Sequence, residues 1–417
     1  MGRILYSTAI YIYGALIRIA ALFHPKAKAF IRGRKNWTSE LKQLTSNDND
    51  WIWIHCSSLG EFEQGRPVIE KIKKEHPGQA VLLSFFSPSG YEVKKDYEHA
   101  DAVVYMPLDT PRNARKFVNI VKPRATLFIK YEFWYHHLRH LHKAGIPIYL
   151  ISASFRKSQM FFRWYGGFFR RMLRFYDTIF VQDNRSAKLL SGINTDTKIS
   201  GDTRFDRVWE ITHETCPGND VSYFAEQAGT VLVAGSTWLP DEEIIETTLE
   251  HFPDMKLILA PHETDQTRIV KIQEIFRNHQ LCCLSASDPE NLKNCRVLIV
   301  DSIGHLAKIY RYADFAYIGG GFGKGIHNTL EAACYGLPVI FGPNHQRFNE
   351  ACELIRNNAA FSINSAEDLH ATLEKLYAKK KRKTVGENAR NYVKNNLGAS
   401  EKILRALEKS DVFSRQS

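Results

Sequence analysis

Short apolar runs alternate with amphipathic segments along most of the chain. In the first half the apolar runs cover residues 51–55, 80–86, 102–106, 125–130, 147–152 and 178–182. Helical patterns separate them, as at residues 68–75, 111–121 and 133–144. Strands that are apolar throughout are buried on both faces, and strands that alternate with helices form a parallel sheet. The first half therefore predicts a doubly wound α/β domain.

The same alternation resumes in the second half, where apolar runs recur at residues 230–234, 256–259, 297–300, 315–318 and 339–341. A chain of 417 residues is too long for one core. Polar stretches at 47–50 and 216–220 have the composition of linkers. We predict an N-terminal segment 1–35, a first Rossmann-like domain 36–212, a second 213–395 and a C-terminal helix 396–417.

The longest apolar stretch lies at residues 4–23, interrupted by Arg18. Its length matches a hydrocarbon core of ~30 Å, and no small-residue cleavage site follows it. Basic residues come directly after it, and positive flanks stay cytoplasmic. We predict a membrane-anchor helix that spans the bilayer or lies in its interface, with the globular part on the cytoplasmic side. The alternative is an amphipathic helix packed on the body of the protein.

A net charge of +11 points to an acidic partner, which could be nucleic acid, an anionic membrane or a phosphorylated substrate. Seven cysteines without a CxxC pair argue against a disulfide framework and favour a reducing cytoplasm. The chain lacks GxGxxG and GxxxxGK[ST], so no motif supports an NAD-binding protein or a P-loop protein. The DxD pattern at residues 48–50 lies in a linker, and we expect no metal site there.

Residues 313–331 combine an apolar run, a glycine cluster and the start of a helix expected to continue through Cys334. A strand that ends in glycines and turns into a helix directs backbone N–H groups at one point, which favours a phosphate. Glu331 lies one turn into that helix, at a reach that suits ribose hydroxyls. The alternative is an ordinary carboxylate on a helix face. The stretch predicts the phosphate end of a nucleotide-sugar site.

Two strand ends of the first half each carry a glutamate, Glu61 in residues 55–61 and Glu132 in residues 130–134. Ligands of doubly wound sheets bind at the carboxyl ends of the strands. A carboxylate there can act as general base on an acceptor hydroxyl, because an ordinary glutamate pKa near ~4.3 leaves it ionised. The alternative for each is a helix-start or surface carboxylate.

Residues 156–174 alternate basic and aromatic side chains. One interpretation is a patch that rests on anionic lipid or holds a phosphorylated acceptor, with Arg156 and Arg163 as contacts. The alternative is an amphipathic helix pair with a solvated basic face.

The strand ends of the second half are also polar, and hydroxyls and helix-start N–H groups there suit a phosphate. The candidates are Ser236, Thr237, Pro261, His262, Gly304, Gly320 and Gly321. Two doubly wound domains with the glycine-rich loop in the second have the layout of the GT-B fold. We therefore expect a GT-B type α/β protein whose two domains face a central cleft, with nucleotide on the second and acceptor on the first.

Taken together, the motifs resemble the 3-deoxy-D-manno-octulosonic acid (Kdo) transferases of lipopolysaccharide synthesis. The resemblance covers nearly the whole chain and rests on the order and spacing of the motifs. They are HCSSLGE at 55–61, YEFW at 131–134, GDTRFD at 201–206, GSTW at 235–238, and GIHNTLE at 325–331 with Gly342-Pro343 after it. The resemblance implies inverting transfer of Kdo from CMP-Kdo to a lipid A precursor of the lipid IVA type, at the cytoplasmic face of the inner membrane. It implies no metal cofactor and no nucleic-acid partner.

By the same resemblance, Glu61 is the catalytic base and Glu132 a second essential acidic residue. The implied CMP contacts include Ser236, Asn328 and Glu331, and the implied acceptor side includes Ser58 and Gly60. Two departures from the family pattern stand out: Pro261-His262 lacks the basic residue of a Pro-Arg-His type motif, and Lys130 replaces the first of two glutamates. Two rival functions are a sugar-nucleotide epimerase of the same fold and a membrane-tethered binding protein without catalysis.

Overall fold

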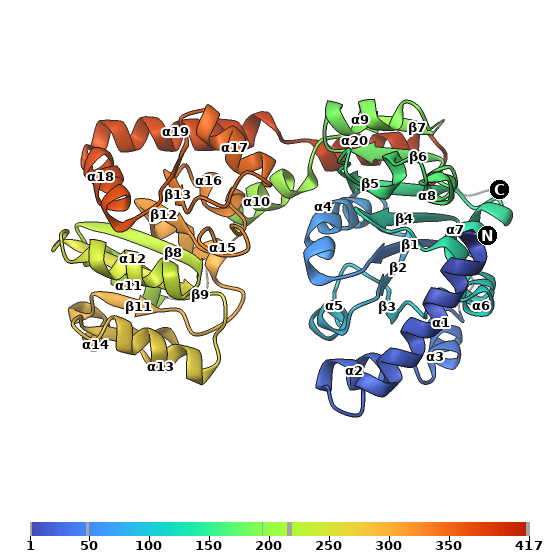
Figure 1. Ribbon diagram of the computed structural model, residues 1–417, viewed down its shortest axis with the longest axis horizontal. Helices are drawn as coiled ribbons and strands as arrows, with labels where there is room; N and C mark the ends of the chain where they lie inside the picture. The colour runs from blue at the N-terminus through green and yellow to red at the C-terminus, as the bar shows by residue number, and fades with distance from the viewer. Residues whose placement is uncertain (1, 47–49, 194, 215–218, 414–417) are drawn as a thin grey trace. The chain divides into compact units, whose positions relative to one another are not determined.

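The computed structural model describes residues 2–46, 50–193, 195–214 and 219–413, so most of both expected linkers and part of the DxD pattern lie outside the described residues (Figure 1). The chain forms two compact units. The first comprises residues 1–207 and 397–417, and the second comprises residues 208–396.

The first unit is built on a seven-stranded sheet in the order β3-β2-β1-β4-β5-β6-β7, with every pairing parallel. Its strands are β1 (Trp51–Cys56), β2 (Ala80–Phe85), β3 (Ala102–Tyr105), β4 (Ala125–Ile129), β5 (Ile148–Ala153), β6 (Thr178–Val181) and β7 (Asp196–Ile199). Its helices are α1 (Gly2–Ala20), α2 (Pro25–Arg32), α3 (Trp37–Leu44), α4 (Leu59–Glu75), α5 (Pro88–Lys94), α6 (Pro111–Val121), α7 (Tyr135–Lys143), α8 (Gly167–Leu173), α9 (Asn184–Leu190) and α20 (Ala399–Glu408), with α10 (Thr203–His213) crossing into the second unit.

The second unit repeats this plan with a parallel sheet in the order β10-β11-β9-β8-β12-β13-β14. Its strands are β8 (Thr230–Thr237), β9 (Met255–Pro261), β10 (Leu281–Cys283), β11 (Val297–Ile299), β12 (Phe315–Ile318), β13 (Val339–Phe341) and β14 (Ala360–Ser362). Its helices are α11 (Asn219–Glu226), α12 (Leu239–Leu249), α13 (Gln266–Ile275), α14 (Pro289–Asn294), α15 (Leu306–Ile309), α16 (Leu330–Ala333), α17 (Asn349–Arg356), α18 (Ala366–Tyr377) and α19 (Lys379–Asn395).

Strand β1 shows why the central strands read as continuous apolar runs. Trp51 and Trp53 pack into the core on one face of the sheet, whereas Ile52 and Ile54 pack into the core on the other. Successive side chains of a strand point to opposite faces, so a sheet covered on both sides needs an apolar residue at every position. The predicted doubly wound architecture is confirmed for both halves.

Each sheet has a central strand from which the strand order runs in both directions. In the first sheet β1 lies between β2 and β4, and in the second β8 lies between β9 and β12. Loops at the carboxyl ends of the two strands diverge there and leave a crevice, which is where open α/β sheets bind ligands. These two crevices, β1/β4 and β8/β12, position the candidate site residues.

Helix α1 is fastened to the first unit and is also apolar on its outer side. Tyr6 donates a hydrogen bond of 2.6 Å to the Asp109 carboxylate, while Ile4 and Leu5 stay 71% and 65% exposed. Among the described helices none is by itself both long and apolar enough for a bilayer crossing. Helices α1 and α2 meet that criterion only as a pair, with a bend of 120° between them.

The C-terminal segment returns to the first unit. Asp206 accepts hydrogen bonds of 2.7 Å each from the Gly398 N–H, the Ser400 N–H and the Ser400 hydroxyl. Helix α20 then buries Ile403 and Leu404 in the same core as β1. The aspartate that closes the GDTRFD motif therefore holds the tail in place.

Candidate active site

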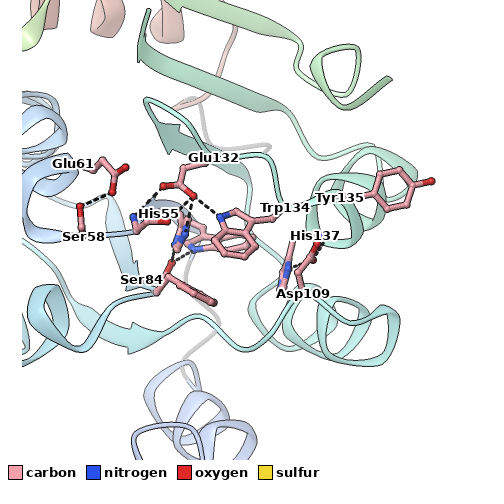
Figure 2. Close-up of polar contacts among 12 residues, drawn as sticks. His55, Ser58, Glu61, Ser84, Asp109, Glu132, Trp134, Tyr135 and His137 are labelled. Atoms are coloured by element: carbon pink, nitrogen blue, oxygen red, sulfur yellow. Dashed lines mark hydrogen bonds and ion pairs between the residues drawn. The ribbon is translucent and has the colours of Figure 1, made fainter. Parts of the chain in front are cut away.

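Glu61 is the third residue of α4, directly beyond the end of β1 (Figure 2). Its Oε2 accepts a hydrogen bond of 2.7 Å from the hydroxyl of Ser58, the residue that precedes the helix. The side chain is half-buried. Burial and the charge of Glu132 raise the pKa of Glu61, and Ser58, His55 and Lys130 oppose that rise. A carboxylate with a raised pKa that still reaches solvent is suited to general-base work.

Glu132 extends from the loop after β4 and closes the β1/β4 crevice. Its carboxylate accepts hydrogen bonds from the Ser57 N–H at 3.1 Å, from the Ser57 hydroxyl at 2.9 Å, and from the Trp134 indole. The residue is 1% exposed, and its backbone carbonyl accepts a hydrogen bond from the Tyr176 hydroxyl. Glu132 therefore holds the loop after β1 rather than presenting a free carboxylate to a ligand.

His55 and Ser84 complete the floor of the crevice beneath Glu132 (Figure 2). The Ser84 hydroxyl accepts a hydrogen bond of 2.7 Å from the Trp53 indole and lies 2.8 Å from His55 Nδ1. If the serine O–H is directed at Nδ1, the imidazole proton is on Nε2, which lies 3.4 Å from Glu132 Oε2. Sequence reasoning missed His55, Ser57 and Ser84, although the first two stand in the quoted HCSSLGE motif.

The expected acceptor residues occupy the same unit. Ser58 is held by Glu61, and a Cβ added at Gly60 would meet no described atom within 4 Å, so the space beside Gly60 is open. Arg156 and Arg163 are exposed. The charge of Arg156 opposes the effect of burial on the pKa of Tyr131, which remains raised, so Arg156 lies near the loop after β4.

The glycine stretch of the second unit differs from the expected phosphate cradle. The N–H of Gly320 donates to Asp241 at 2.9 Å, and the N–H groups of Gly323 and Gly325 both donate to the Gly320 carbonyl. The expected helix, which was to run from the glycines through Cys334, is the four-residue α16, Leu330–Ala333. The prediction of a long helix was wrong, because the residues before α16 form turns and irregular backbone, in which the N–H groups of Gly323, Gly325 and His327 donate to the carbonyls of Gly320 and Gly319.

The glycines are instead required by close backbone approach. A Cβ on Gly319 would lie 2.6 Å from Thr237 Cα, and a Cβ on Gly321 would lie 2.5 Å from the Gly342 nitrogen. Gly320 has φ of +89°, a conformation that other residues rarely adopt. The cluster therefore lets the loops after β8, β12 and β13 pack against one another at the crevice.

Asp241 is the counterpart of Glu132 in the second unit. Its carboxylate accepts hydrogen bonds from the Trp238 N–H at 2.9 Å, the Tyr317 hydroxyl at 2.8 Å and the Gly320 N–H at 2.9 Å. It is 1% exposed, and burial raises its pKa against the opposing effect of these donors. Asp241 thus joins α12 to the glycine loop across the β8/β12 crevice, and sequence reasoning did not single it out.

Two of the expected phosphate contacts lie side by side with different surroundings. Ser236 is half-buried and has φ of +56°, whereas Thr237 is fully buried. The Thr237 hydroxyl donates to Glu242 at 2.8 Å, and Glu242 also accepts from Arg268 at 2.5 Å. The structure brings Ser236 to the mouth of the crevice and places the Thr237 side chain behind it.

Three rings stack at the same edge of the second sheet. The centroid of His262 lies 4.7 Å from that of Trp238 and 4.5 Å from that of His327, with interplanar angles of 28° and 27°. Burial and the neighbouring His262 lower the pKa of His327. His327 and Trp238 were quoted in motifs but not selected as site residues, because sequence spacing does not reveal stacking.

The remaining donor candidates lie on three segments of the second unit, at the end of β9, after β11 and after β12. The Asn328 Oδ1 accepts from the Leu330 N–H at 3.1 Å, and its Nδ2 donates to Glu331 Oε1 at 2.9 Å. Pro261 ends β9 and is buried, while Gly304 is exposed on the loop after β11, with φ of +96°. Pro261 and Gly304 lie at or after the carboxyl ends of strands, Asn328 lies in the loop after β12, and Glu331 lies in α16.

Comparison with known proteins agrees with these observations. Residues 31–207 match the family model described as 3-deoxy-D-manno-octulosonic-acid transferase (kdotransferase). The 3-deoxy-D-manno-octulosonic acid transferase of Aquifex aeolicus is 26% identical over 374 residues, which cover 88% of this chain and 97% of that protein. The enzymes of the same name from Haemophilus influenzae and Rickettsia prowazekii are 26% and 28% identical, cover 86% and 83% of this chain, and are themselves covered to 86% and 76%.

Solved structures show the same fold at low sequence identity. A UDP-N-acetylglucosamine 2-epimerase structure has a TM-score of 0.62 at 14% identity, covering 88% of this chain and 98% of that chain. A putative enzyme of that name from Listeria monocytogenes has a TM-score of 0.60 at 13% identity, covering 89% and 99%. These likenesses support the predicted GT-B class of fold and carry no argument about the substrate.

Proposed function

We propose that this chain is a Kdo transferase whose sugar donor, acceptor and general base are CMP-Kdo, a phosphorylated lipid A precursor and Glu61. The acceptor hydroxyl attacks the anomeric carbon of Kdo as its proton passes to Glu61. The bond from the anomeric carbon to the phosphate oxygen breaks, and CMP leaves with the bonding electrons. Attack opposite the leaving group inverts the anomeric configuration.

The observation that carries the proposal is the contrast between the two acidic residues of the β1/β4 crevice. Glu132 is 1% exposed and bound by three donors, whereas Glu61 is half-buried at the start of α4. A general base must come within hydrogen-bond reach of the proton that it removes, so accessibility favours Glu61. Its raised pKa brings it closer to the operating pH, which strengthens it as a base.

The donor is assigned to the β8/β12 crevice of the second unit. The N–H groups of Gly320, Gly323 and Gly325 are used internally, and side chains around the loop contribute to the anion contact. The stacked imidazoles of His262 and His327 offer ring N–H donors to an anion, in place of the basic residue missing beside Pro261. Ser236 supplies a hydroxyl, and Glu331 is assigned to the ribose.

The lipid acceptor is assigned to the first unit. Exposed apolar side chains on α1, namely Ile4, Leu5, Ile12, Leu16 and Ile19, suit the boundary of a bilayer, and Arg156 and Arg163 suit an acceptor phosphate. We assign the protein to the inner membrane, peripheral or single-pass, with both units on the cytoplasmic side.

One experiment tests the whole assignment. Purified protein is incubated with CMP-Kdo and lipid A precursors bearing one or two phosphates, and the lipid products are weighed by mass spectrometry. Addition of Kdo with release of CMP is the expected result. No lipid product, together with epimerisation of a soluble sugar nucleotide, would overturn the proposal in favour of an epimerase.

A further inference from the structure

A second buried carboxylate lies behind the β1/β4 crevice, and the proposed reaction does not use it. Asp109, in the loop after β3, is fully buried and accepts four hydrogen bonds. Two come from the N–H groups of His136 and His137 at 2.9 Å each, and one from His137 Nδ1 at 2.6 Å. Asp109 thus caps the first turn of α7, where the helix dipole also favours a negative charge (Figure 2).

The fourth hydrogen bond comes from the N-terminal helix. Tyr6 of α1 donates to Asp109 Oδ2 at 2.6 Å, and the next residue, Ser7, lies 3.0 Å from His136 Nε2. The Tyr6 ring packs against Tyr135 at a centroid distance of 5.8 Å. Helix α1 is therefore attached to the first turn of α7 by two neighbouring polar side chains, although 103 residues separate Tyr6 from Asp109 in the chain.

The first turn of α7 continues directly from the segment that carries Glu132. Trp134 is the residue that precedes α7, and its indole donates to the Glu132 carboxylate. Residues 132–137 are consequently held at one end by Glu132, bound to Ser57, and at the other end by Asp109, bound to Tyr6. Ser57 in turn precedes Ser58, which contacts Glu61.

The hydrogen bonds of Asp109 outweigh the effect of its burial. Burial alone raises the pKa of Asp109, yet the donors from His137 and Tyr6 and the His136 N–H outweigh it, and the net pKa is lowered. A buried ionised carboxylate that loses a donor is left with an uncompensated desolvation cost. The position of the 132–137 segment is therefore sensitive to whether Tyr6 is in place.

We propose that Tyr6 and Asp109 are positioning residues for the transfer reaction, which set the 132–137 segment and through it the Ser57-Ser58 turn that presents Glu61. Helix α1 then has a second role besides any contact with lipid. Its packing against the first unit helps to position Glu61. This inference rests on the proposed function and adds residues that do not touch the substrates.

The test compares Tyr6→Phe with Tyr11→Phe in the full chain. Both variants remove one phenolic hydroxyl from α1, but Tyr11 is 57% exposed, whereas the Tyr6 hydroxyl is bound to Asp109. With the acceptor in detergent micelles, where attachment to a bilayer is not needed, we expect Tyr6→Phe to lower kcat about three- to tenfold with little change in the acceptor KM. Tyr11→Phe should match the wild type.

Hydrogen exchange gives a readout that does not depend on activity. Amides of the first turn of α7, including His136 and His137, should exchange faster in Tyr6→Phe and at the wild-type rate in Tyr11→Phe, because the cap at Asp109 is weakened only in the first. Wild-type kcat in Tyr6→Phe would overturn the inference, and so would faster exchange without a fall in kcat. If the wild type itself transferred no Kdo, the proposed function would fail. The exchange rates would still show whether Tyr6 stabilises the first turn of α7 through Asp109.

Discussion

The two units each have an acidic residue at the same position in the fold, but the two residues differ in exposure and in hydrogen bonding. Glu61 is the third residue of the helix after β1, and Asp241 is the third residue of the helix after β8, each strand being the central one from which the strand order of its sheet runs in both directions. Glu61 is half-buried with a hydrogen bond from Ser58, whereas Asp241 is 1% exposed with three donors around it. The position in the fold therefore does not determine whether a carboxylate is reactive or structural.

The difference arises from what the neighbouring strand supplies. In the second unit β12 presents the Tyr317 hydroxyl and the Gly320 N–H to Asp241, and these draw the carboxylate into the crevice. In the first unit the loop after β4 brings a carboxylate of its own, Glu132, which takes up the Ser57 donors. Glu61 is left half-buried without such donors, and burial together with the negative charge of Glu132 raises its pKa.

The largest effect should come from Glu61→Gln. The amide keeps the shape and can still accept from Ser58, but it cannot take the acceptor proton. We expect Kdo transfer to fall by about 10²–10⁴-fold, the usual contribution of a general base, while CMP-Kdo binding measured by calorimetry stays at the wild-type level. Normal turnover by this variant would contradict the assignment of the base.

Asp241→Asn should show the opposite signature. The amide places an N–H₂ group against donors that need an acceptor, so we expect a loss of about 1–3 kcal/mol in the stability of the second unit. CMP binding should weaken because the glycine loop loses its anchor at Gly320. Denaturant unfolding followed together with calorimetric titration measures both quantities. Unchanged stability and CMP affinity would show that Asp241 does not hold the glycine loop against α12.

Glu132→Gln should change the pH dependence of the transfer rate. The charge of Glu132 is one of the causes that raise the pKa of Glu61, so removing that charge lowers the pKa. The base then stays ionised to lower pH, and the acidic limb of the pH–rate profile moves to lower pH. A variant that loses rate with an unshifted limb would indicate that Glu132 acts through geometry alone.

The last effect concerns the stability of the fold in acid. Burial lowers the pKa of His136 to about 4, whereas an unfolded histidine titrates near ~6.5. Between these values the unfolded chain binds the extra proton, so the free energy of unfolding falls as the pH drops from about 6.5 to about 4, by up to about 1.4 kcal/mol per pH unit. His136→Gln should flatten this slope in urea titrations at pH 7 and pH 5. If the free energy of unfolding changed equally with pH in both proteins, the lowered pKa of His136 would be contradicted.

The central strands were predictable from the sequence, whereas of the four edge strands only β3 was predicted. Runs such as 125–130 and 315–318 gave their strands within a residue or two, because a strand buried on both faces has no polar position. The three strands that the pattern missed, β7, β10 and β14, all lie at sheet edges and are short or exposed. Edge strands pair on one side only, and their composition resembles that of loops.

At the site, strand ends gave the location of Glu61 and Glu132 but not the difference between them. The burial of Glu132 depends on Ser57 and Trp134, one of which lies 75 residues away in the sequence. In the glycine stretch, the N–H groups of Gly320, Gly323 and Gly325 are taken by Asp241 and by the Gly320 carbonyl, partners that no local pattern reveals. Local chemistry identifies candidates, and tertiary hydrogen bonds decide which of them are free.

The return of the tail to the first unit makes the chain sensitive to truncation in an unexpected place. A stop codon at residue 397 would leave every residue of the second unit intact. It would nevertheless remove α20, with Ile403, Leu404 and Leu407, from the core that supports β1 and β4, and it would leave Asp206 without its Gly398 and Ser400 donors. The half that carries Glu61 is made first at the ribosome. Its core can be completed only after translation has reached the last helix.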